Sequence, residues 1–285
     1  MSANTKPAVI TYEPDNSLKK GYFYLMAEAF VDLRNNRWLT YQFFKRDFFA
    51  LYKQSFFGFF WAVLMPLASV STFIVLNRSG LLSLGKMTVP YSIYALMGLA
   101  FWQLFSTGLL GSSNSLIKAG PMVLKINFSK KSLVLASVGQ ALIPCSILLI
   151  LVGFLFVGYG MTPHVGCLLV PFLITPLLLL SIGLGFVLSV LNGIMRDIGH
   201  IISVLLAFVL FLTPVLYAKP ETGILAKMTH YNPLYYLISV PRDISLHGTT
   251  WEGIGFLIVS AISVVVFLTC LLAFHLTEPR VAERI

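Results

Sequence analysis

The side chains that usually carry catalysis or bind metals are scattered along this sequence. Eleven Asp and Glu residues occur in 285 positions, and none of them falls inside a long apolar stretch. No acid chain of the kind that proton-coupled pumps use is therefore expected in the membrane. The histidines stand alone, and the cysteines lie in or beside apolar runs without Cys-x-x-Cys spacing: His164, His200, His230, His247, His275, Cys145, Cys167 and Cys270. The sequence predicts no catalytic residue, no metal site and no cofactor in this chain.

Aromatic residues recur along one apolar stretch, residues 91–111. Tyr and Trp at the ends of such stretches are typical of the belts that membrane proteins place at lipid headgroups. Phe101 and Trp102 lie deeper, where aromatic faces suit a channel that carries sugar rings. Four residues are candidates for lining such a channel: Tyr94, Phe101, Trp102 and Phe105. A belt or packing role explains the same residues, and both interpretations stay open.

Composition places the chain in a membrane. Hydrophobic residues make up 57% of it and charged residues only 11%, with a mean hydropathy of +0.85. Soluble domains carry about 25% charged residues, so lipid must solvate much of this surface. The net charge of +9 does not indicate nucleic acid, because the basic residues lie between apolar stretches rather than in Lys/Arg-rich runs.

Six apolar stretches are each about long enough to cross a ~30 Å hydrocarbon layer at about 1.5 Å per residue. They cover residues 56–76, 91–111, 133–157, 168–192, 198–217 and 253–274. The predicted fold class is therefore an all-α polytopic membrane protein with six transmembrane helices. The expected organisation is a cytoplasmic N-terminal segment (1–36), an amphipathic interface helix (37–55), a six-span domain (56–276) and a cytoplasmic tail (277–285).

Basic residues near the span ends predict the orientation. One side holds eleven: Arg37, Lys45, Arg46, Lys53, Lys118, Lys125, Lys130, Lys131, Arg196, Arg280 and Arg284. The other side holds five: Arg78, Lys86, Lys219, Lys227 and Arg242. Because cytoplasmic loops are enriched in Lys and Arg, both termini are expected in the cytoplasm. Residues 1–15 contain no apolar run, so no cleavable signal peptide is expected.

Two segments are predicted to lie outside the spans. Residues 37–54 place Tyr41, Phe44, Phe48, Leu51 and Tyr52 on one face of a helix, with Gln42, Arg46 and Lys53 opposite. This pattern indicates a helix in the membrane interface, although packing against the underside of the protein itself would explain it too. Residues 231–240 form an apolar run too short to cross, within the long external connection 218–252. A re-entrant or interfacial segment is expected there.

A nucleotide site is not expected. Residues 80–87 approach the spacing of a phosphate-binding loop, but Met87 stands where Ser or Thr would bind magnesium and no strand precedes the loop. Work driven by ATP would therefore need another chain.

Ordered motifs resemble the type-2 ABC exporter permeases for polysaccharides, in the branch that exports O-antigen, capsule and teichoic acid. The opening motifs are Arg46-Asp47, Tyr52-Lys53-Gln54-Ser55, Gly58-Phe59-Phe60-Trp61 and Pro66-Leu67. Residues 98–105, 112–116, 191–198, 213–217 and 232–234 continue the likeness, which covers about residues 35–285. One departure is Ile126-Asn127-Phe128-Ser129-Lys130, which lacks the proline of the family's Phe-Pro-Arg-like step.

The resemblance implies a homodimeric permease with two ATPase subunits beneath it, which would hold ATP and Mg. A lipid-linked polysaccharide would enter from the cytoplasm of a bacterium and cross the inner membrane. Residues 117–128 would form the coupling helix, and 231–240 the re-entrant exit helices. Candidates for contacting the ATPase are Lys118, Lys125, Phe128, Arg196 and Asp197. The Arg196-Asp197 pair would equally serve only to end two helices.

Arg46 and Lys53 are candidates for binding the lipid diphosphate of such a substrate, because cations near the inner leaflet attract phosphate. Snorkelling toward anionic lipid headgroups explains them equally well. Two other functions remain open: an exporter of the same architecture for drugs or lipids, and a membrane enzyme acting on lipid-linked sugars. The enzyme would need an acid or histidine cluster at one interface, which the sequence lacks.

Overall fold

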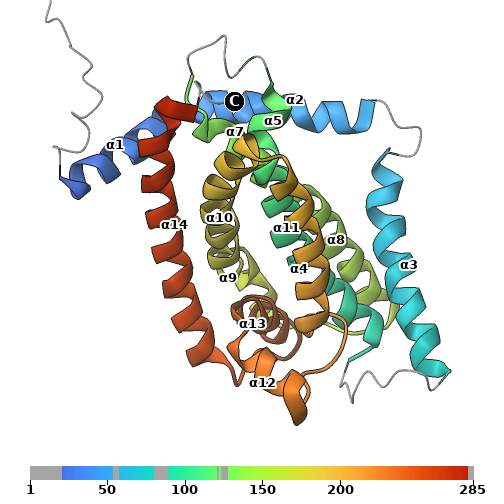
Figure 1. Cartoon of the computed structure of the whole chain (residues 1–285). Helices are drawn as coiled ribbons and strands as arrows, with labels where there is room; N and C mark the ends of the chain where they lie inside the picture. Colours follow the sequence, from blue (N-terminus) through green and yellow to red (C-terminus); the bar gives the residue numbers. More distant parts are fainter. Residues whose placement is uncertain (1–20, 54–57, 80–88, 121, 123–127, 282–285) are drawn as a thin grey trace, which may run out of the picture.

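The structure is a computed structural model that describes residues 21–53, 58–79, 89–120, 122 and 128–281. Every regular secondary-structure element in these residues is a helix (Figure 1). The helices are α1 (Tyr22–Asn35), α2 (Arg37–Lys53), α3 (Gly58–Arg78), α4 (Tyr91–Ser113), α5 (Ser115–Ala119), α7 (Lys131–Gln140), α8 (Leu142–Gly158), η1 (Val165–Leu169), α9 (Val170–Leu173), α10 (Thr175–Ile194), α11 (Asp197–Leu212), α12 (Gly223–Tyr231), α13 (Pro233–His247) and α14 (Gly253–Val281). Residues 80–87 and Lys125 lie outside the described residues.

Four helical segments in the described part of the chain are long and apolar enough to span a membrane. They are Tyr91–Ser113, Lys131–Gly158, Val165–Ile194 and Gly253–Glu278, and they match four of the six predicted stretches. The other two stretches are also helical, as α3 and α11, but their apolar parts are shorter, Val63–Thr72 and Asp197–Leu212. Helix α11 ends before Pro214, which lacks an N–H to continue it, so its 16 residues reach only about 24 Å.

Prolines also explain a break in each of two long segments. Segment Lys131–Gly158 breaks between α7 and α8 at Ala141, and segment Val165–Ile194 breaks between α9 and α10 at Ile174. Pro144 and Pro176 follow these breaks within the next turn. Because the proline ring clashes with the carbonyl four residues earlier, each helix changes direction there.

Helix α10 lies in the middle of the bundle and packs against α14 on one side and α4 on the other. Small residues allow the close approach. A Cβ atom added to Gly183 would lie 2.8 Å from the Cα of Phe267 on α14, and one added to Gly185 would lie 2.3 Å from the Oγ of Ser112 on α4. Membrane helices associate largely by such packing of small residues.

Replacing Gly183 by alanine is therefore expected to destabilise the fold by about 1–2 kcal/mol, since the clash with α14 outweighs the better helix propensity of alanine. Thermal unfolding of the purified protein in detergent measures the effect. Gly153→Ala is the matched control, because a Cβ atom at Gly153 would meet nothing within 4 Å. Equal unfolding temperatures for the two variants would contradict the close α10–α14 contact.

Helix α2 lies across one end of the bundle, and α13 lies at the opposite end (Figure 1); these are called the α2 end and the α13 end below. Helix α2 is both packed and exposed. Phe43 is buried and its ring contacts that of Phe128 at 5.5 Å, and Gln140 Nε2 of α7 donates to the carbonyl of Phe44 at 2.6 Å. Tyr41 and Phe49 are more than half exposed. The helix thus contacts the protein's own underside and also presents aromatic side chains outward.

The connection 218–252 folds into α12 and α13. Asn232 begins α13, because its side-chain oxygen accepts a hydrogen bond from the Leu234 N–H at 3.0 Å and Pro233 occupies the first turn. Residues 234–242 of α13 are all buried, against η1, α9, α14, α4 and α10. The predicted short apolar run is therefore a helix shielded by protein, as a backbone that does not cross requires.

Candidate functional site

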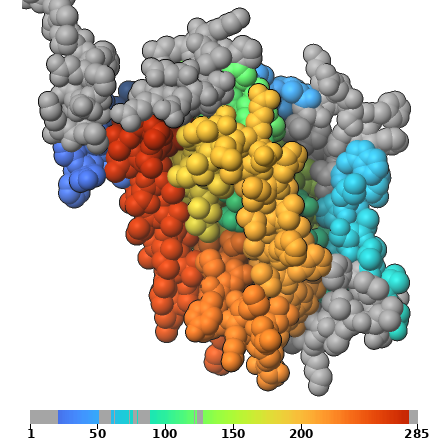
Figure 2. Space-filling view, in the orientation of Figure 1, coloured from blue at the N-terminus to red at the C-terminus, as the bar shows by residue number. Residues whose placement is uncertain are grey.

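A groove of about 450 Å³ runs between α4 and α11. In the view of Figure 2 the gold to orange side chains of α11 lie on the surface of the molecule. The α4 wall is one face of that helix, since its residues recur at intervals of three or four. The groove is lined by Trp102, Ser106, Thr107, Leu110, Gly111, Asn114, Lys118, Ser203, Leu206, Ala207 and Leu210.

The lining suits a polar, largely uncharged chain. Hydroxyl groups of Ser106 and Thr107 and the amide of Asn114 both donate and accept hydrogen bonds. Trp102 adds an aromatic edge to this wall. Lys118 is exposed at the α2 end of the groove and supplies a positive charge there. Hydroxyl and amide groups beside an aromatic ring are the combination that binds sugars, and an ammonium group adds attraction for phosphate.

The α2 end of the groove is held by Asn192, which has no exposed surface. Its amide nitrogen donates to the Ser113 carbonyl and to Asn114 Oδ1, both at 3.0 Å. Its oxygen accepts the Gly199 N–H of α11 at 2.8 Å. One side chain on α10 thereby joins the end of α4 to the start of α11 and fixes a residue of the groove wall. Every polar atom of the Asn192 amide group is used, as buried polar groups require.

The α13 end of α11 is held by Arg242, a buried arginine on α13 that is only 2% exposed. Its Nη1 donates to the carbonyls of Pro214 and Val215 at 3.3 and 3.2 Å, and its guanidinium lies 3.8 Å from the centre of the Tyr94 ring. Tyr91 donates to the Leu216 carbonyl at 2.9 Å. These donors satisfy backbone carbonyls of the non-helical segment that follows α11.

The predicted aromatic residues divide into three positions. Trp102 lines the groove, and Tyr94 lies against Arg242 and donates to the Tyr217 carbonyl at 3.3 Å. Phe101 has no exposed surface and Phe105 is 4% exposed, so both belong to the hydrophobic core of the single chain. A channel-lining role for these four residues stays a prediction.

The predicted cations and those ATPase-contact residues that the structure describes, which exclude Lys125, lie at the α2 end. Arg46 pairs with Asp47 at 2.8 Å and lies 5.0 Å above the Phe43 ring. Arg196 and Asp197 are both exposed in the turn between α10 and α11. Lys53 ends α2. Phe128 packs on Phe43, while Lys118 faces the groove.

Asn192 and Arg242 were not singled out as site residues from sequence. Asn192 appeared only inside the motif 191–198, and Arg242 only in the count of basic residues. The signal for Arg242 was Thr213-Pro214 itself, because a chain that leaves a helix inside apolar surroundings has backbone carbonyls that need donors from elsewhere.

Comparison with known proteins identifies the family. Residues 39–246, from α2 to the last turn of α13, match the model of the ABC-2 type transporter family. The chain is 28% identical over 211 residues to an O-antigen export system permease protein RfbA of Klebsiella pneumoniae, covering 72% of this chain and 78% of that protein. It is 26% identical over 260 residues to a protein of the same name from Myxococcus xanthus, covering 89% and 98%. The chain therefore belongs to the ABC-2 type transporter family.

Proposed function

We propose that this chain is the transmembrane permease subunit of an ABC exporter that moves a lipid-linked polysaccharide of the O-antigen type out of the cytoplasm. The observation that carries the proposal is the groove on α4, where hydroxyl, amide and indole groups line one wall inside an otherwise apolar bundle. The relatives named as O-antigen export permeases support the same substrate class. Because the matched family is one of transporters, we propose that this chain transports its substrate rather than catalysing a reaction on it.

The proposed topology has six crossings in a bacterial inner membrane, with both termini cytoplasmic. Helices α3 and α11 run beside the four long segments and complete the count (Figure 1). The α2 end carries Lys118, Lys130, Lys131 and Arg196, in agreement with the positive-inside rule. The exposed Tyr41 and Phe49 support a location for α2 in the cytoplasmic interface.

The proposed partners are a second copy of the chain and cytoplasmic ATPase subunits, which would bind ATP and Mg. The connection from α5 to α7, with Lys118, Lys125 and Phe128, and the exposed turn of Arg196 and Asp197 are the proposed ATPase contacts. Lys118, Phe128, Arg196 and Asp197 share the end of the bundle that the proposed topology places in the cytoplasm.

Deleting the gene for this chain is expected to abolish surface polysaccharide and to leave lipid-linked glycan inside the cell, with recovery on complementation. Glycan analysis of the cell surface and of the lipid fraction provides the measurement. Normal surface glycan after deletion, or export of a drug or lipid instead, would overturn the proposed substrate. An ATPase that fails to co-purify with the chain would argue against the proposed complex.

Removing the cations of α2 is expected to weaken export without lowering the amount of protein. Arg46→Ala together with Lys53→Ala should reduce export several-fold, because two charges that attract the lipid diphosphate at the inner leaflet are lost. Surface glycan per unit of permease measures the effect. Lys45→Ala is the control, since it removes an exposed neighbouring charge from the same helix. If the double variant exports as well as Lys45→Ala, these residues only anchor the helix to lipid headgroups.

A further inference from the structure

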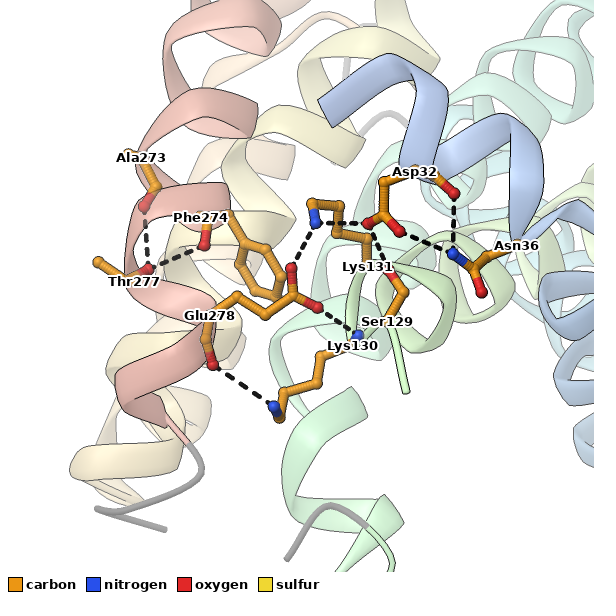
Figure 3. A network of polar contacts seen from close by, with 9 residues as sticks. All are labelled: Asp32, Asn36, Ser129, Lys130, Lys131, Ala273, Phe274, Thr277 and Glu278. Atoms are coloured by element: carbon orange, nitrogen blue, oxygen red, sulfur yellow. Dashed lines mark hydrogen bonds and ion pairs between the residues drawn. The ribbon is translucent and has the colours of Figure 1, made fainter. Parts of the chain in front are cut away.

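A cluster of charged residues at the α2 end ties three distant parts of the chain together (Figure 3). Its centre is Lys131 at the start of α7, which is only 1% exposed. The Lys131 ammonium donates to Asp32 Oδ2 of α1 at 2.7 Å and to Glu278 Oε2 of α14. We call Asp32, Ser129, Lys130, Lys131 and Glu278 the Lys131 cluster.

The residues just before Lys131 make the same two connections. Ser129 Oγ donates to Asp32 Oδ2 at 2.8 Å, and the backbone N–H of Lys130 donates to Glu278 Oε1 at 2.5 Å. Asn36 holds the other Asp32 oxygen at 2.7 Å. Three consecutive residues are thus bonded to α1 and α14 through two carboxylates.

The surroundings of Asp32 favour its ionised form. Burial by itself raises the pKa of Asp32, but hydrogen bonds from Lys131 and Ser129 outweigh it and hold that pKa below its ordinary value. Buried ion pairs add little net stability compared with well-packed apolar residues, but their bonds fix direction and distance. The main effect of the cluster is therefore to fix the positions of α1, α7 and α14 relative to one another.

The cluster lies at the start of α7 and bonds it to α1 and α14. Phe128 and Ser129 lead directly into α7, and Phe128 is one of the proposed ATPase contacts. The Lys131 cluster bonds Ser129 to α1 and Lys131 to both α1 and α14. Beneath the cluster, Leu133 of α7, Ala29 of α1 and Phe274 of α14 share one hydrophobic core. A force applied to Phe128 and Ser129 is thus passed to α1 and α14.

We propose that Lys131 is a positioning residue that makes α7, α14 and α1 move as one body when an ATPase subunit pushes on Phe128 and Ser129, just before α7. This rests on the proposed function as a permease worked by an ATPase. With the cluster intact, movement of the start of α7 displaces α14 along the bundle. Without it, α7 moves without α1 and α14, and ATP is hydrolysed without matching export.

The test compares export with ATP hydrolysis in the complete complex. Lys131→Met is expected to lower the amount of glycan exported per ATP by about tenfold, while the ATPase subunits still bind and hydrolyse ATP. The measurements are glycan export and phosphate release by the permease–ATPase complex in lipid vesicles. Lys45→Met is the control: it removes an exposed lysine of α2 at the same end of the bundle, outside the cluster.

A second variant guards against misfolding. Lys131→Met leaves two carboxylates without their cation, so the combined variant Lys131→Met, Asp32→Asn and Glu278→Gln removes every unpaired charge while keeping the side-chain shapes. It is expected to accumulate normally and to show the same loss of export per ATP. An unchanged ratio would overturn the proposal, as would failure of the combined variant to accumulate, which would assign the cluster to folding.

The outcomes also separate this inference from the proposed function. A wild-type complex that exports no glycan refutes the proposed function itself. A wild-type complex that exports glycan, with variants of unchanged ratio, refutes only the role of Lys131.

Discussion

Replacing Asn192 by leucine is expected to lower export about tenfold and to destabilise the protein by about 2–4 kcal/mol. Leucine has a similar size but leaves the Gly199 N–H and the oxygens of Ser113 and Asn114 without their partner. An unsatisfied buried polar group costs about 1–3 kcal/mol. The larger effect is expected on export, because Asn192 bonds the Asn114 side of the groove to Gly199 in the first turn of α11.

The measurements are surface glycan per unit of permease and the unfolding temperature in detergent. Ser189→Ala is the matched control one turn earlier on α10. Its hydroxyl is equally buried but donates only to the Phe186 carbonyl within its own helix, at 2.8 Å. If Asn192→Leu behaves like Ser189→Ala, the junction of α4, α10 and α11 does not shape the groove.

Replacing Arg242 by methionine is expected to have a comparable effect at the α13 end. The carbonyls of Pro214 and Val215 lose a charged donor, and the Tyr94 ring loses its cation, for a combined cost of about 2–4 kcal/mol. The segment after α11 should then detach from α4. Protease susceptibility of residues 213–222 and export per unit of permease report this change.

The variant Arg242→Lys tests whether the positive charge of the side chain is enough or its planar shape is also needed. Arg242→Lys is expected to recover only part of the loss, because a single ammonium group lacks the planar fork that reaches two carbonyls while stacking on a ring. Lys227→Met is the control, since it removes an exposed charge from α12 at the same end of the bundle. Equal behaviour of Arg242→Met and Lys227→Met would reduce Arg242 to one more external charge.

The prolines show which helix ends can be predicted from the local sequence. The apolar stretch 198–217 was expected to span, and its helical part indeed begins at Asp197. Pro214 lies inside that stretch and ends the helix at Leu212, because a proline without an N–H removes a backbone bond. Sequence alone does not say whether neighbours will restore such a bond and continue the helix. Here the chain leaves the helix, and Arg242, Tyr91 and Tyr94 bind carbonyls of the segment that follows it.

The aromatic residues of α4 show what the local sequence does not predict, namely which neighbours each side chain faces. Tyr94, Phe101, Trp102 and Phe105 were grouped by their place along one helix, yet the helix rotates them by about 100° per residue toward different neighbours. Trp102 reaches the groove, while Phe101 and Phe105 enter the core. A helix that is apolar on all sides offers no pattern from which the groove-facing side can be read.

What the sequence by itself determined is the membrane class, four long spans, the helical character of the remaining stretches and the family. Each follows from the length of apolar runs, since a backbone in lipid must satisfy its own hydrogen bonds, or from motifs in order along the chain. What only the tertiary structure decided is which polar side chains meet. Lys131 counted in the sequence as a cytoplasmic charge, but its partners lie 99 and 147 positions away in Asp32 and Glu278. Such pairings depend on how helices pack, and packing is set by contacts among all of them at once rather than by any local stretch.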